Sequence, residues 1–258
     1  LYNNIAAEPV VAHEDYSFKF TTAFDGSGKF KAMCTQVAHF PVYNEFNVLQ
    51  GCCTDGTYFY LVMQTQIRDT MTCVIEKVDP ATWEIVQVSD PLPVDHGNSI
   101  TYLPDTNQLV IANCIPDPKL VSWVAADTLK YIRTEKIPYN ASSLSWSQAR
   151  QQYAIMGANK STLIVDAKLG VTDSYNGLAS NYTNQGYVVD DDYIYIISNS
   201  GNAVHVCDWE GHWIESISIP VGTEMESMIP YGDGDMYYST FLNQGADIFA
   251  TIFYRRLY

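Results

Sequence analysis

Short hydrophobic stretches, separated by glycine, aspartate or asparagine turns, follow one another along most of this chain. They repeat as a unit: a polar opening, two strands around an acidic turn, an amide, a third strand ending in Asp and a fourth ending in Pro. The second strands of successive units contain Tyr60, Val110, Ala154, Tyr195 and Tyr238. Four short strands in every 40 to 50 residues, roughly, are typical of the blades of a β-propeller.

These units predict an all-β fold, a five-bladed β-propeller that forms a single domain over residues 1–258. We expect blades near residues 48–93, 94–138, 139–178, 179–220 and 221–258, with residues 16–41 completing the last one. The N-terminal segment would then close the ring by pairing into the last blade, which removes two exposed sheet edges. Residues 16–24 and 247–254 both fit the third strand of that blade, and the pattern leaves this choice open.

The charge of the chain narrows the choice of partners. Its formal net charge is −15, with only 14 Lys and Arg. Because nucleic acids and anionic lipids are bound through clustered basic side chains, we expect neither as a partner. The sequence also lacks the run of roughly 20 apolar residues that a membrane-spanning helix needs.

The cysteines and acidic residues do not predict a metal or a cofactor. The six cysteines lack the paired spacing of zinc sites and are interpreted as small buried residues. Disulfides from Cys52 or Cys53 to Cys73 or Cys114 are the alternative. The run of three aspartates at 190–192 is interpreted as a hairpin turn rather than a cation site, because Ca²⁺ takes its six to eight oxygens from a loop of alternating ligands.

Polar residues recur at two places in the unit, and in a propeller both places lie at one mouth of the central channel. One set opens the first strands and the other follows the second strands, where an amide recurs. Amides donate and accept hydrogen bonds without charge, so we interpret both sets as a ring that binds a neutral ligand, the alternative being that the amides only form turns. The predicted ligand-binding residues are Gln50, Gln64, His96, Asn98, Asn113, Asn159, Gln185, Asn199, Glu226 and Asn243.

A family resemblance rests on three features: Gln50-Gly51 at one opening, the segment from Gly97 to Thr101 at the next, and a repeated Val-Asp-x-x-Thr/Gly turn. Together they resemble the five-bladed propellers of glutaminyl cyclotransferases. That resemblance implies a Glu between two glycines as general acid/base at the second opening. Here the sequence is Asp95-His96-Gly97-Asn98, so Asp95 or His96 would have to act instead. The repeat is also similar to propeller modules of surface and phage-tail proteins of Gram-positive bacteria, which implies a binding role.

We therefore expect a non-catalytic binding module that recognises a neutral glycan or peptide at the mouth, in an extracellular, cell-surface or virion-surface setting. One alternative is a cyclotransferase- or hydrolase-like enzyme that uses His96, Asp95 and Glu226. Another is a scaffold that meets a protein partner through the same face. The enzyme alternative requires His96, Asp95 and Glu226 to converge within hydrogen-bond reach of one substrate.

Overall fold

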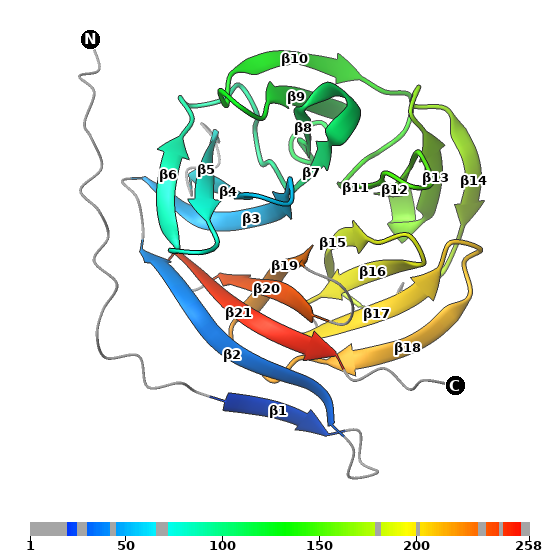
Figure 1. The fold of residues 1–258 in the computed structure, drawn as a ribbon. Helices are drawn as coiled ribbons and strands as arrows, with labels where there is room; N and C mark the ends of the chain where they lie inside the picture. The colour runs from blue at the N-terminus through cyan, green and yellow to red at the C-terminus, as the bar shows by residue number, and fades with distance from the viewer. Residues whose placement is uncertain are drawn as a thin grey trace.

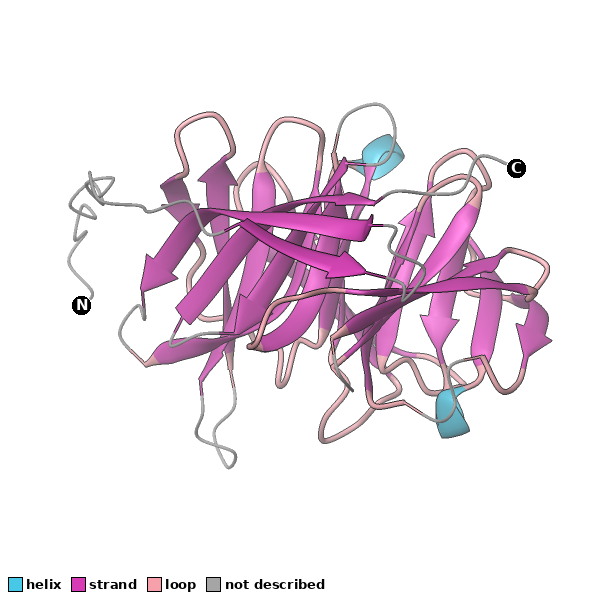
Figure 2. Cartoon of the chain, turned by 90° about the horizontal axis from the view of Figure 1, so that it is seen from below, coloured by secondary structure: helices cyan, strands magenta, loops and turns pink. Residues whose placement is uncertain are grey.

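The computed structural model describes residues 20–24, 30–41, 45–65, 72–178, 182–199, 202–231, 236–242 and 245–253. Within these ranges the protein is built from antiparallel strands, and the helical elements are two short 3₁₀ turns, η2 (Pro104–Thr106) and η3 (Ala158–Lys160). Figure 2 shows these turns on opposite faces of the molecule, at the ends of the strands. The prediction of an all-β fold is confirmed.

Three sheets contain four strands each, paired in chain order. The first consists of β7 (Ser99–Leu103), β8 (Gln108–Ala112), β9 (Leu120–Ala125) and β10 (Tyr131–Lys136). The second consists of β11 (Ser143–Ser147), β12 (Gln152–Met156), β13 (Thr162–Asp166) and β14 (Val171–Tyr175). The third consists of β15 (Asn184–Val189), β16 (Tyr193–Ser198), β17 (Ala203–Asp208) and β18 (Trp213–Ser218).

The remaining strands form a nine-stranded arrangement with two arms. The β3–β6 arm consists of β3 (Phe46–Thr54), β4 (Phe59–Thr65), β5 (Cys73–Asp79) and β6 (Glu84–Val88). The β19–β1 arm consists, in spatial order, of β19 (Glu224–Pro230), β20 (Met236–Leu242), β21 (Gly245–Phe253), β2 (Phe30–Pro41) and β1 (Phe20–Phe24). A single parallel pair, Gly245 with Val48, connects the arms.

The β19–β1 arm decides between the two terminal segments. Strand β21 pairs with β20 and takes the third place, and β2 pairs with β21 from Ala32 to Pro41 and takes the fourth. Strand β1 pairs only with β2 and adds a fifth strand on the outside. The C-terminal segment therefore fills the place that the sequence pattern left open, and the N-terminal segment pairs beyond it.

The sheets lie around a common centre, with β3, β7, β11, β15 and β19 nearest to it (Figure 1). Each of these first strands contacts the next, and β19 contacts β3. The close approach explains Gly51, because a Cβ atom at this residue would lie 2.7 Å from the Cα atom of Ser99. The first strands therefore form the inner wall of the molecule.

Hydrophobic clusters fill the space between neighbouring sheets, and each draws residues from two of them. On β16, Ile194 and Ile196 face the β11–β14 sheet, whereas Tyr195 and Ile197 face the β19–β1 arm. Because side chains alternate between the two faces of a strand, a second strand buried on both faces is apolar at almost every position. A cluster that includes Leu61 and Ile248 joins the two arms in the same way.

Serine and threonine side chains bind the inner strands to one another. Ser99 Oγ accepts a hydrogen bond from the N–H of Leu144 at 2.8 Å, and Ser143 Oγ accepts one from the N–H of Tyr187 at 2.8 Å. Thr101 repeats the contact with Trp146. The first strand of each sheet is an edge, and these hydroxyl groups satisfy its buried backbone donors.

Candidate functional site

One face of the molecule carries the ends at which the first strands begin. We call the polar group on this face the mouth and define it by Asn98, Ser142, Gln185, Glu224 and Glu226. Asn98 directly precedes β7 and Ser142 directly precedes β11, whereas the other three lie in the opening residues of β15 and β19. The repeat thus brings residues that are far apart in the sequence to one end of the inner wall.

Asn98 connects three sheets. Its Nδ2 donates to the carbonyl oxygen of Ser142 at 2.8 Å and to that of Gln185 at 2.7 Å. An Asn side chain has two amide hydrogens, so both are used in these contacts. The loop that carries Asn98 requires Gly97, whose φ is +65° and where a Cβ atom would lie 2.7 Å from Cys73 Sγ.

Two carboxyl groups surround the side-chain amide of Gln185. Its Nε2 lies 2.5 Å from Glu224 Oε1 and 3.3 Å from Glu226 Oε2. Asn199 Nδ2 donates to the same Glu224 oxygen at 2.6 Å. No Lys or Arg of the described chain forms an ion pair with either carboxyl group. The mouth therefore holds two acidic groups through neutral donors.

Glu226 is the group at the mouth whose ionisation is changed most. It is 6% exposed. Burial raises the pKa of its carboxyl group, the nearby Glu224 charge raises it further, and the Gln185 hydrogen bond lowers it, which gives a pKa of about 9. Burial of a carboxyl group favours its neutral form, so Glu226 holds a proton at neutral pH.

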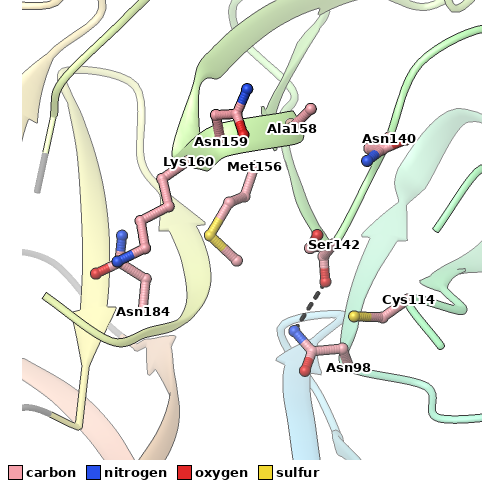
Figure 3. Close-up of a pocket in the computed structure, with 10 residues that line it drawn as sticks. Asn98, Cys114, Asn140, Ser142, Met156, Ala158, Asn159, Lys160 and Asn184 are labelled. Carbon is pink, nitrogen blue, oxygen red and sulfur yellow. Dashed lines mark hydrogen bonds between the residues drawn. The ribbon is translucent and has the colours of Figure 1, made fainter. Parts of the chain in front are cut away.

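A pocket of about 320 Å³ opens beside Asn98. Figure 3 shows the side chains that line it, from the loops that precede β7 and β11, from the β8–β9 and β12–β13 connections, and from the start of β15. The polar lining residues are Asn98, Asn140, Ser142, Asn159, Lys160 and Asn184, and Met156 and Cys114 also line the pocket. Apart from the cation Lys160, the polar lining is neutral and rich in amides, which suits a ligand that carries hydroxyl or amide groups.

Asp95 and His96 lie in the loop before β7, the opening of the strand that follows the β3–β6 arm. No hydrogen bond or ion pair of the described chain joins any two of the side chains of Asp95, His96 and Glu226. Burial lowers the pKa of His96, and a hydrogen bond with Asn98 raises it in part. Its Nδ1 atom is buried and has no hydrogen-bond partner among the described residues. Burial raises the pKa of Asp95.

The amides that follow the second strands do not share one environment. Asn113 is 1% exposed and its Oδ1 accepts a hydrogen bond from Ser122, which joins β8 to β9. Gln64 is also buried, at 5% exposed, as is Gln50 on β3. Asn159 is exposed in the pocket, where its φ of 54° is left-handed. Asn199 reaches Glu224, and Asn243 lies outside the described residues.

The reason for this difference is local. A buried amide at the end of a strand is needed to pair backbone or side-chain groups, and the sequence pattern cannot distinguish that role from ligand binding. The predicted ligand-binding residues do not include several residues of the mouth and pocket, namely Ser142, Glu224, Cys114, Asn140, Asn184 and Lys160. Glu224 carries a readable signal, since it lies two residues before Glu226 and so on the same side of β19.

The acidic turn at the other end of the strands is a hairpin turn, as its sequence predicts. Asp190 Oδ1 accepts the backbone N–H groups of Asp192 and Tyr193, and its Oδ2 accepts the hydroxyl group of Tyr195 at 2.5 Å. The described residues contain no group of three or more His, Cys, Asp or Glu side chains that could hold a metal ion. All six cysteines lie among the described residues, and each is a free thiol.

The described chain contains no helix of the length and apolar character that crossing a membrane requires. No protein-family model and no curated protein matches the sequence.

Solved structures do match, and they define the fold: the chain is a β-propeller. Glutaminyl cyclase from Myxococcus xanthus matches with a TM-score of 0.64 and 8% identity, over 86% of this chain and 97% of that one. The WD40 repeats of RRP9 match with a TM-score of 0.51 and 9% identity, over 92% and 100% of the two chains. U3-55K matches with a TM-score of 0.51 and 9% identity, over 82% and 77%. At these identities the likeness concerns the fold alone.

Proposed function

We propose that the β3–β6 arm and the β19–β1 arm are the first and last blades of a single five-bladed propeller, which the N-terminal segment closes. Two observations support this count. The first strands contact one another in sequence from β3 to β19 and back to β3. A hydrophobic cluster lies between the two arms, as it does between every other pair of neighbouring sheets. Closure buries edges that would otherwise pair with other chains.

We further propose that the propeller is a binding module that recognises a polar ligand, a neutral glycan or a peptide, at its mouth. The observation that carries this proposal is the chain of contacts from Asn98 through Gln185 to Glu226, which runs across the mouth beside a pocket of about 320 Å³. Ligand sites are concave and contain a few convergent polar groups that fix orientation. A pocket of this volume holds a ligand the size of one or two sugar rings or amino acids.

Cys114 provides a direct test of this site. It is partly exposed in the pocket, whereas the other five cysteines are buried. A ligand found by calorimetric titration with neutral oligosaccharides and peptides should protect Cys114 from iodoacetamide, and modified protein should no longer bind it. Protein that binds equally well after modification of Cys114 would show that the ligand is held elsewhere.

Amide variants test the residues of the mouth. We expect Asn98→Ala and Gln185→Ala to weaken binding at least tenfold. Gln87→Ala is the matched control, because Gln87 also donates from its side-chain amide to a backbone carbonyl of the neighbouring sheet, that of Thr128, but lies far from the mouth. Unchanged affinity in both mouth variants would contradict the proposal.

One observation favours an enzyme as a second candidate. A buried carboxyl group with a pKa of about 9 carries a proton that it can donate at neutral pH. If the protein transforms its ligand, Glu226→Gln should abolish turnover, because an amide occupies the same volume but cannot release a proton. Binding should persist in this variant. Turnover at the wild-type rate in Glu226→Gln would exclude Glu226 as the acid.

A further inference from the structure

The hydrogen bonds at the mouth fix which way each amide faces. Asn98 Nδ2 contacts two backbone carbonyl oxygens, and the Gln185 and Asn199 amide nitrogens contact carboxyl oxygens. Carbonyl and carboxylate oxygens only accept hydrogen bonds. The NH₂ end of each amide must therefore point into the protein network, and the opposite orientation would place oxygen against oxygen.

This arrangement leaves acceptors for a ligand. Among the described residues, Gln185 Oε1, Asn199 Oδ1 and Glu224 Oε2 have no hydrogen-bond partner. Glu224 is exposed, and Glu226 lies beside it, buried, with Gln185 between them. The end of the mouth formed by β15 and β19 thus offers oxygen acceptors and the negative charge of the exposed Glu224, and its amide donors are already used.

The pocket beside Asn98 has a different character. It contains the cation Lys160, whose Nζ donates to the carbonyl oxygen of Tyr182. Its other polar lining side chains are amides and a hydroxyl group, and Glu224 and Glu226 do not line it. A ligand that spans both places would meet negative charge at one end, and neutral groups with a positive charge at the other.

We propose that the ligand is a glycan that contains an amino sugar with a free ammonium group. The ammonium group donates to the Glu224 carboxylate, and the hydroxyl groups of the same and the next ring bind the free amide oxygens and the asparagine-lined pocket. Lys160 repels a second ammonium group and so orients the ligand. This inference rests on the proposed binding function and replaces the neutral glycan with a cationic one, because acceptor groups select ligands that donate hydrogen bonds.

The test compares three short oligosaccharides by isothermal titration: glucosamine oligomers, their N-acetylated counterparts, and glucose oligomers of equal length. We expect the free amines to bind at least tenfold more tightly than either neutral series. Glu224→Gln should remove most of this preference. Glu84→Gln is the matched control, since it removes the same charge from an exposed residue on β6, outside the mouth.

The outcomes separate this inference from the proposed function. If the neutral oligomers bind as tightly as the amines, or Glu224→Gln binds the amines like wild type, the inference is overturned and the binding module stands. If a lysine-containing peptide binds and no glucosamine oligomer does, the amino sugar is excluded while the mouth remains a binding site. If no oligosaccharide or peptide binds at all, both proposals fail.

Discussion

The two ends of the inner strands carry acidic residues in opposite circumstances. At the hairpin end, Asp55 and Asp190 make the same contacts in two sheets: one oxygen accepts two backbone N–H groups, and the other accepts the hydroxyl group of Tyr60 or Tyr195. At the mouth, Glu226 lies beside the amide of a neighbouring sheet and a second carboxyl group, and no other sheet repeats this arrangement within the described residues.

The comparison separates acids that stabilise a repeated turn from an acid that does not. An acid that recurs with the same partners stabilises the turn that recurs with it, whereas an unrepeated buried acid without a cation raises the free energy of the folded state. Such a residue is expected at a site where function outweighs stability. The predictions below test whether the two kinds of acid behave differently, beginning with the largest effect.

Replacing Glu226 with Gln should stabilise the protein at high pH. The folded-state pKa of about 9 lies above 4.5, the usual pKa of a Glu carboxyl group, so the folded protein holds a proton that the unfolded chain releases, and stability falls as pH rises between these values. Relative to Glu226→Gln, the wild type should lose about 1.4 kcal/mol for each pH unit in this window. Urea unfolding from pH 5 to pH 9 measures this difference. If the unfolding free energies of the wild type and Glu226→Gln change with pH in parallel, Glu226 is an acid of the same kind as Asp55 and Asp190.

Replacing Asp190 with Ala should destabilise the protein, which is the opposite of the effect expected for Glu226→Gln. The substitution leaves two backbone N–H groups and the buried hydroxyl group of Tyr195 without their acceptor, and Tyr237 OH also contacts this carboxylate. We expect a loss of about 3 kcal/mol of unfolding free energy, since each hydrogen bond to a charged group contributes about 1.5 to 3 kcal/mol. Asp55→Ala should behave alike in chemical denaturation. A loss in only one of the two would mean that the repeated contacts are not equivalent.

Glu76 gives a third comparison, at the contact between the two arms. It is 1% exposed on β5, and its Oε2 has no hydrogen-bond partner among the described residues. Burial raises the pKa of Glu76 to about 7, so its destabilising effect should build up from the unfolded value near 4.5 and be complete above 7. The unfolding free energy of Glu76→Gln should therefore exceed that of the wild type by up to roughly 3 kcal/mol. This difference should not increase further from pH 8 to pH 9. A gain that continues there would contradict the assigned window.

Ser143 tests the hydroxyl groups of the inner wall. Ser143→Ala removes the acceptor for the N–H of Tyr187, and we expect a loss of about 1 kcal/mol. Thermal unfolding should show this loss of stability, and the affinity for the ligand should not change. A loss of affinity without a loss of stability would instead assign Ser143 to the binding site.

The smallest effect is expected on the outermost strands. Val86 on β6 is 49% exposed, and Val86→Thr should change the unfolding free energy by less than about 0.5 kcal/mol. The change in unfolding free energy of this variant is the reference value for a surface substitution, with which the acid variants are compared. A larger change would mean that β6 packs against a surface that the isolated chain does not reveal.

The sequence predicted the strands well because second strands buried on both faces are continuously apolar, as in residues 193–198. It also contained the hairpin acids, since Asp55 and Asp190 are each followed by tyrosines at the same two positions, Tyr58 and Tyr60 or Tyr193 and Tyr195. The site was predicted less completely. Asn98, Gln185 and Glu226 do lie together at the mouth, but Asn113 and Gln64 are buried in the sheets. Whether an amide faces a ligand or a neighbouring strand depends on contacts between sheets, which no repeat pattern encodes.

The pairing of β2 with β21 has a consequence for how the chain is made. Gln36 and Asp247, which share a hydrogen bond across this pair, are separated by 211 positions. The three sheets from β7 to β18 can each form as soon as they leave the ribosome, because their strands are neighbours in sequence. Strand β2 is synthesised before all of them and must wait for its partner, for tens of seconds at about 5 to 20 residues per second. Chaperone binding during synthesis should therefore concentrate on this early strand, whose edge toward β21 has no partner strand until translation is nearly complete.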